Sequence, residues 1–140
     1  MHANNTYQAL ERILRFFPDD AKTGLLMDLS LCLRAIISQR RVPGLDGERV
    51  PAVEVMLNSP FIADLIRKGE IDRIHDVIAK CRDAGMGTFD QSLLELYRRG
   101  NISRETAVRF AESHTDVGVH IRLLEGRARN TGSLRIDSST

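Results

Sequence analysis

Few residues in this chain have the type and spacing that chemistry requires. The candidate metal ligands outside the carboxylates are Cys32, Cys81, His2, His75, His114 and His120. The histidines share no ligand spacing with one another or with the cysteines, so the sequence predicts no metal site. The sequence also lacks the Gly-x-x-x-x-Gly-Lys-Ser/Thr loop and the Gly-x-Gly-x-x-Gly turn that hold phosphate groups. We therefore expect no catalytic residues and no cofactor for this chain alone.

Three further groups each have a functional and a structural interpretation. Gly85-Met86-Gly87 precedes a predicted helix, where it could bind an anion or simply turn the chain. Asp19 and Asp20 could form an acid/base pair or place negative charge at a helix start. Residues 39–41, Gln-Arg-Arg, are the most basic local patch and could contact nucleic acid or lie on a solvated strand edge. We favour the structural interpretation of all three, and a net charge of +1 argues against a nucleic-acid surface.

The stretch from residue 25 to residue 60 organises the predicted fold. Apolar residues at helical spacing predict a central helix from Leu25 to Ile37. The turn sequence Pro43–Gly47 then joins two β-prone segments, 39–42 and Arg49–Leu57, into a hairpin. The second segment is rich in valine without strict alternation, so we expect both of its faces to be covered. Two strands alone are marginal in water, which requires cover from the helices or from a sheet elsewhere.

Short amphipathic helices surround this centre. A first helix is capped at Asn4, Asn5 or Thr6, and its apolar stripe includes Tyr7 and Phe17. Later helices are expected after Ser59, Glu70, Thr88 and Ser103 and over residues 116–124, with a capping box at Thr88-Phe89-Asp90-Gln91. The fold class is thus mainly α with a two-stranded β-hairpin.

Composition places the chain among ordinary globular proteins. It has 140 residues, of which 42% are hydrophobic and 28% charged, which fits one domain with a real core. Both cysteines fall on predicted apolar helix faces and are expected to be buried thiols in a reducing compartment. No run of 18 apolar residues exists, and the first residues do not form a secretory signal. We expect a cytoplasmic protein without direct membrane insertion.

Four segments then resemble, in order, segments of the type IV pilus retraction ATPases of the PilT/PilU type. Residues 33–43 read LRAIISQRRVP beside the family's LRGVVSQRLLP, and residues 53–56 resemble its A-x-E-V/I-M strand. Residues 59–69, SPFIADLIRKG, resemble TPAIRNLIREGK, and residues 85–97 resemble GMQTFDQALFELY. Within residues 59–69, Phe61, Ala63, Asp64 and Lys68 stand where the TPAIRNLIREGK version has Ala, Arg, Asn and Glu. This variant is closer to the PilU-type members. His2 to Ile13 resembles the segment that opens with the family's His box.

The resemblance implies the C-terminal half of a RecA-like α/β P-loop ATPase domain with its C-terminal helices. It divides the chain into residues 1–58, the end of the RecA-like core, residues 59–125, a C-terminal helical subdomain, and residues 126–140, a disordered tail. By resemblance only, His2 is the nucleotide-sensing histidine. The retraction-motif helix carries Phe61, Ile62, Asp64, Leu65, Ile66 and Arg67. A helix that opens almost at the first residue is typical of a chain that begins inside a larger domain.

The implied function is that of a piece of a motor that couples ATP hydrolysis to pilus retraction in twitching motility. The intact family binds ATP and Mg²⁺ and forms hexamers that act on the inner-membrane pilus platform. Without Walker A and Walker B this chain is expected to be inactive by itself. Two alternatives stay open at this point: a free-standing helical adaptor that docks on a pilus ATPase ring, and a nucleic-acid binder that uses residues 39–41 and the arginine-rich tail.

Overall fold

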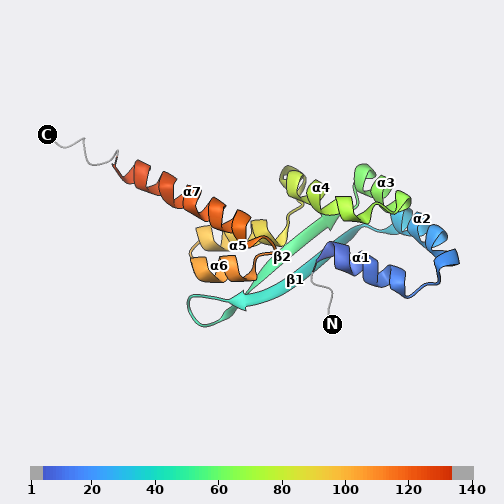
Figure 1. The fold of residues 1–140 in the computed structure, drawn as a ribbon, viewed down its shortest axis with the longest axis horizontal. Coiled ribbons are helices and arrows are strands. Elements are labelled where there is room, and N and C mark those ends of the chain that lie inside the picture. The colour runs from blue at the N-terminus through green and yellow to red at the C-terminus, as the bar shows by residue number, and fades with distance from the viewer. Residues whose placement is uncertain (1–4, 134–140) are drawn as a thin grey trace.

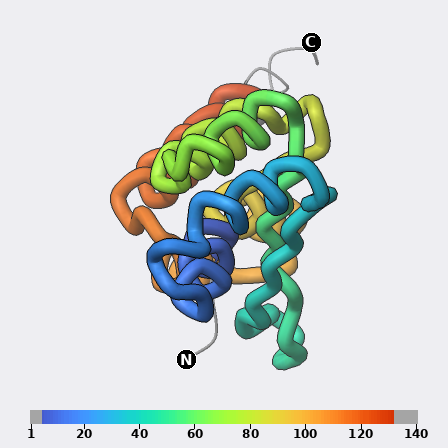
Figure 2. Tube along the Cα trace, turned by 90° about the vertical axis from the view of Figure 1, so that its right-hand side faces the viewer, coloured from blue at the N-terminus to red at the C-terminus, as the bar shows by residue number. Residues whose placement is uncertain are grey.

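A computed structural model describes residues 5–133 and confirms a mainly helical chain with one antiparallel hairpin (Figure 1). The elements in order are α1 (Thr6–Arg15), η1 (Asp19–Ala21), α2 (Lys22–Cys32), β1 (Ala35–Pro43), β2 (Arg49–Leu57), α3 (Pro60–Lys68), η2 (Ile71–Arg73), α4 (Ile74–Lys80), η3 (Arg82–Ala84), α5 (Phe89–Arg98), α6 (Arg104–Phe110) and α7 (His114–Ser133). The hairpin runs diagonally through the molecule, with α1–α4 gathered at one end and α5–α7 at the other (Figure 1). The perpendicular view in Figure 2 shows the hairpin along one side of the helices. Within the described residues, none of the helices has the length and hydropathy needed to cross a membrane.

The central helix is shorter than its apolar pattern predicts. α2 ends at Cys32, and Ala35 already pairs with Leu57 in a ladder that continues to Pro43 and Arg49. The expected helical segment 33–37 is therefore wrong. Nine residues of strand pairing, supported by the β-branched side chains of Ile36 and Ile37, outweigh the helical periodicity of this segment.

Asn58, which follows β2, forms hydrogen bonds with the C-terminal end of α2. Its side-chain Nδ2 donates to the carbonyl oxygens of Ser30, at 3.1 Å, and Leu33, at 2.8 Å. Its backbone N–H donates to the carbonyl of Arg34 at 2.9 Å. The carbonyls at a helix C-terminus lack partners within the helix, so this contact satisfies two of them and stabilises the helix-to-strand transition. The sequence gives no local signal for it, because Asn58 lies 25 residues beyond Leu33.

β2 buries one face fully and the other only in part, so the second face is less covered than the sequence predicts. The buried face consists of Ala52, Glu54 and Met56, while Val53 and Val55 on the opposite face are only partly buried. The free edge of β2 is partly closed by Gly87, which exchanges two backbone hydrogen bonds with Val55.

The core consists of two clusters that meet at β2. The first cluster contains Leu10, Met56, Ile62, Leu65, Ile66, Ile71, Ile74, Ile78 and Met86. The second contains Val42, Ala52, Phe89, Leu93, Ile102, Ala107, Ala111, Val117 and Ile121. Since Ala52 and Met56 belong to different clusters, Glu54 lies on β2 between the two. Each cluster includes residues from both sides of position 58. The predicted division between residues 1–58 and 59–125 stays a prediction.

Several side chains that the sequence predicts to be buried are exposed, and the last helix is longer than predicted. Cys32 is exposed and Cys81 partly buried, because the strand that follows Cys32 leaves the thiol at the end of α2 rather than inside an apolar stripe. Tyr7 and Phe17 are 36% and 43% exposed, so only Leu10 of the first stripe is fully buried. The last helix, α7, continues to Ser133 and extends away from the body (Figure 1). Residues 126–133 are therefore helical, and the rest of the predicted disordered tail, 134–140, lies outside the described residues.

Candidate functional site

The helix that carries the six predicted retraction-motif residues is α3, and its ends are defined by local chemistry. The Ser59 hydroxyl accepts a hydrogen bond from the N–H of Ile62, and Pro60 occupies the first helical position. Gly69 ends the helix with φ of 73°, a left-handed conformation that glycine adopts without steric cost. The start and end of α3 agree with the sequence prediction.

The six residues divide between core and surface. Ile62, Leu65 and Ile66 are buried in the first core cluster. Phe61 is 55% exposed. It borders a hollow of about 300 Å³ that is also lined by Arg73, Asp76, Val77, Lys80 and Cys81. The three buried residues therefore hold α3 in place, and the exposed members are the ones available to a partner.

Asp64 and Arg67 form a surface ion pair on α3. Arg67 Nη2 donates to Asp64 Oδ1, and Lys68 Nζ lies 2.8 Å from Asp64 Oδ2. The hydrogen bond from Lys68, with a further one from Arg67, holds the pKa of Asp64 below its ordinary value. Surface pairs of this kind contribute little to stability because solvent screens them. Their charge remains available for recognition.

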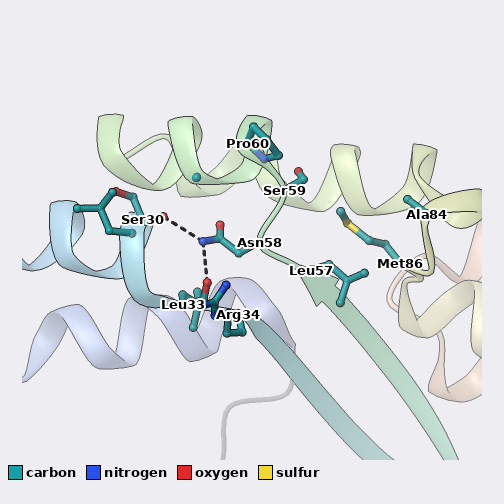
Figure 3. A pocket seen from close by; sticks show the side chains of 11 residues that line it. Ser30, Leu33, Arg34, Leu57, Asn58, Ser59, Pro60, Ala84 and Met86 are labelled. Carbon is teal, nitrogen blue, oxygen red and sulfur yellow. Dashed lines mark hydrogen bonds between the residues drawn. The ribbon is translucent and has the colours of Figure 1, made fainter.

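A groove lies between α2, the start of α3 and the end of β2 (Figure 3). Its volume is about 520 Å³, and its lining is Ser30, Leu31, Leu33, Arg34, Leu57, Asn58, Ser59, Pro60, Ala63, Ala84 and Met86. A second hollow of about 200 Å³ shares part of this lining and reaches Asp64 and Arg67. Leu31 is 73% exposed at its rim. Asn58 Oδ1 is buried in the groove wall without a partner among the described residues. The groove thus connects the surface of α3 to the helix-to-strand transition.

His2 lies outside the described residues, which begin at Asn5, and both Asn5 and Thr6 are held by hydrogen bonds. Asn5 caps α1 by accepting from the N–H of Gln8 at 2.9 Å, and its Nδ2 donates to Glu112 Oε1 at 2.9 Å. The N–H of Thr6 donates to Glu54 Oε1 at 2.8 Å. Two carboxylates from distant parts of the chain therefore fix the start of α1.

Glu54 is the centre of this arrangement and was not among the predicted site residues. It is 1% exposed, and its second oxygen accepts from the N–H of Phe89 at 3.4 Å. Glu54 therefore accepts hydrogen bonds from the first turns of both α1 and α5. Negative charge is favourable at these positions, because helix N-termini have unpaired N–H groups and a positive dipole end. A carboxylate inside an otherwise apolar strand is the sequence signal that could have revealed it, since buried charges require partners.

Arg40 connects the hairpin to the same region. Its guanidinium lies 3.1 Å from Glu112 Oε1 and 4.2 Å from the centre of the Phe89 ring. Asp90 accepts from the N–H groups of Glu112, at 2.7 Å, and Ser113, at 3.0 Å. The basic patch 39–41 is thus occupied by internal contacts at Arg40. In the described part of the chain these groups hold helix ends in position and do not form a nucleophile–base pair.

The fold is a helical assembly on a two-stranded hairpin, and its exposed site is helix α3, whose surface ion pair lies beside a groove. No family model matches the chain. The PilU type IV pilus ATPase of Pseudomonas aeruginosa is 48% identical over 124 residues, 88% of this chain and 32% of that protein. A twitching motility protein of Neisseria gonorrhoeae is 35% identical over 114 residues, 81% of this chain and 30% of that protein.

Solved structures agree with these relatives. A crystal structure of the pilus retraction motor PilT with bound ADP matches 83% of this chain with a TM-score of 0.71 and 28% identity, over 32% of its own length. The DotB ATPase of Legionella pneumophila matches 76% with a TM-score of 0.62 and 19% identity, over 29% of its own length, and shows the fold alone. The chain belongs to the PilT/PilU family of type IV pilus retraction ATPases, and it spans about a third of the length of the relatives it matches.

Proposed function

We propose that this chain is the part of a type IV pilus retraction ATPase that couples the nucleotide state of the motor to retraction. The observation that carries the proposal is the 48% identity with PilU over 88% of the chain. It includes the helix that resembles the family's retraction motif, and the match to PilT extends over the same fold. The adaptor alternative has no support of this kind.

The chain by itself does not hydrolyse ATP in this proposal. Phosphoryl transfer requires a phosphate-binding backbone, a lysine and a Mg²⁺ ligand set, and the sequence contains no Walker A loop to supply the first two. ATP and Mg²⁺ act in the intact motor, where His2 takes the sensing role that the resemblance implies. The bound ADP of the PilT structure supports nucleotide binding by that relative.

The surface of α3 is the coupling element. Ile62, Leu65 and Ile66 attach α3 to the core, and Phe61, Asp64 and Arg67 face outward. A displacement of the core during the ATP cycle would therefore move these exposed groups as a rigid unit. The partners are the neighbouring subunits of a hexamer and the inner-membrane pilus platform, and the compartment is the cytoplasm.

A chimera tests this proposal. Residues 5–133 replace the matching segment of P. aeruginosa PilU in a strain that depends on PilU, and twitching is measured. We expect the chimera to restore twitching and Arg67→Ala to reduce it. Arg98→Ala is the matched control, because Arg98 also forms an i,i+3 ion pair, with Glu95 at 2.8 Å. A stable chimera that forms the ring but never supports twitching would refute the proposal.

The separate claim of inactivity has its own test. The isolated chain is titrated with a fluorescent ATP analogue in the presence of Mg²⁺. We expect no saturable binding at concentrations of the ATP analogue up to about 1 mM. A dissociation constant above this value corresponds to a binding free energy weaker than about 4 kcal/mol. Saturation in the micromolar range would contradict it.

A further inference from the structure

Three potential metal ligands from separate elements lie together beside the start of α1. They are Glu54 of β2, His75 of α4 and Glu112 of the segment between α6 and α7, and one ligand atom from each lies within 4.8 Å of the others. His75 Nδ1 is 4.0 Å from Glu112 Oε2. We propose that these residues form a zinc site. One imidazole and two carboxylates are ligands that Zn²⁺ accepts, with a fourth position left for water.

The distances are close to those that coordination needs. Bonds of about 2.1 Å in a tetrahedral site place neighbouring ligand atoms roughly 3.4 Å apart. The three side chains must therefore move together by about an ångström. Glu54 is held by two backbone N–H groups, so the adjustment falls on His75 and Glu112, whose side chains are 46% and 24% exposed.

An unpaired hydroxyl beside the cluster is a second, independent observation. Thr6 is 1% exposed, and its Oγ1 is buried without a hydrogen-bond partner among the described residues. The N–H of the same residue lies 2.8 Å from Glu54 Oε1, so Thr6 is a direct neighbour of the cluster. Buried polar atoms without a partner are rare, and ordered water often satisfies them. A water on the zinc, if it lay within reach of Thr6 Oγ1, would supply the missing partner.

The existing contacts leave ligand positions available. Glu112 uses Oε1 for Asn5 and Arg40, while Oε2 is the oxygen nearest to His75. Each carboxylate oxygen has two lone pairs, so the N–H contacts of Glu54 do not prevent coordination. Arg40 is the competing cation, since its guanidinium neutralises Glu112 at 3.1 Å. Removing that charge should strengthen zinc binding, which a purely structural cluster would not show.

This inference does not rest on the pilus function. Histidine and cysteine spacing gives no sign of this site, because its ligands include two carboxylates and come from positions 54, 75 and 112. The structure alone brings them together.

Calorimetric titration of the tag-free chain with ZnCl₂ near neutral pH tests the site, with Co²⁺ absorption as a second readout. We expect one saturable site, weakened by roughly tenfold or more in His75→Ala. Two matched controls should bind as the parent chain does. His120→Ala removes a histidine whose Nδ1 lies 2.7 Å from the Asp116 carbonyl oxygen of its own helix, and Cys32→Ser removes an exposed thiol. Arg40→Met keeps the apolar stem and should tighten binding.

Three results would overturn the proposal. They are no zinc binding below about 1 mM, binding unchanged by His75→Ala, or binding lost with Cys32 or His120 instead. His75 is exposed, so its substitution should leave the fold intact, and circular dichroism verifies this for each variant. If Arg40→Met fails to fold, the zinc affinities of His75→Ala and His120→Ala still distinguish the proposed site from other zinc binding.

Discussion

Replacing Glu54 by glutamine should destabilise the protein far more than the same change at the surface. Glu54 accepts from Thr6 at 2.8 Å and from Phe89 at 3.4 Å and is 1% exposed. In Glu54→Gln, the amide oxygen can keep the shorter bond, while the NH₂ group then faces the N–H of Phe89. An unsatisfied buried donor costs about 1–3 kcal/mol. Loss of negative charge at two helix N-termini adds about 0.3–1 kcal/mol for each helix.

The expected loss of unfolding free energy is therefore about 1.5–5 kcal/mol, a large part of the stability of an ordinary domain. Urea unfolding followed by circular dichroism measures it by linear extrapolation. Hydrogen exchange should also quicken in the first turn of α5, where the N–H of Phe89 loses its acceptor. Exchange in α1 should change less, because the bond to Thr6 can remain.

The matched control is Glu48→Gln in the hairpin turn. Glu48 is exposed, and its contacts with Gly44 and Asp46 use backbone atoms. We expect a change within about 0.5 kcal/mol, as for ordinary surface positions. A Glu54→Gln variant as stable as this control would refute the role of the Glu54 carboxylate in holding the two helix ends.

Three smaller effects follow from other contacts. Asn58→Ala removes the hydrogen bonds that close α2 and should cost about 2 kcal/mol in urea unfolding, with faster hydrogen exchange at the end of that helix. Tyr97→Phe breaks a 2.9 Å bond to Glu125 and should cost about 1 kcal/mol. That bond raises the pKa of Tyr97, so the cost should be full below pH 10.0 and vanish as the pH rises through the higher folded-state pKa. Hydrogen bonds from the neighbouring arginines, that of Arg98 the largest, lower the pKa of Glu95 to about 2, so its contribution is present above pH 4.5 and is lost as the pH falls toward 2. Unfolding curves of the parent chain and Glu95→Gln should therefore converge in acid, and a constant difference would contradict this.

Local signals predicted the helix boundaries well where the chemistry is local. The capping box at Thr88 forms with both of its hydrogen bonds, and Ser59 and Ser103 cap α3 and α6. A cap depends on atoms three residues apart, so the sequence contains everything needed to recognise it. The exposed site residues on α3 could be placed on one helix for the same reason.

Predictions failed where a distant contact overrides local preference. The segment after Cys32 has helical periodicity, but pairing with β2 turns it into a strand, and Asn58 closes the preceding helix. The valine-rich pattern of β2 predicted cover on both faces, yet the fully buried face contains Glu54, because the starts of two helices and their N–H groups meet there. Neither outcome follows from composition or period.

The sequence by itself determined the family, the caps of α3, α5 and α6 and the hairpin turn, because each can be recognised within short segments of the chain. Only the tertiary structure showed that Glu54, His75 and Glu112 share one location and that Glu54 links two helix ends. The physical reason is that a buried charge is stable only with partners, and the fold brings those partners from segments dozens of residues apart.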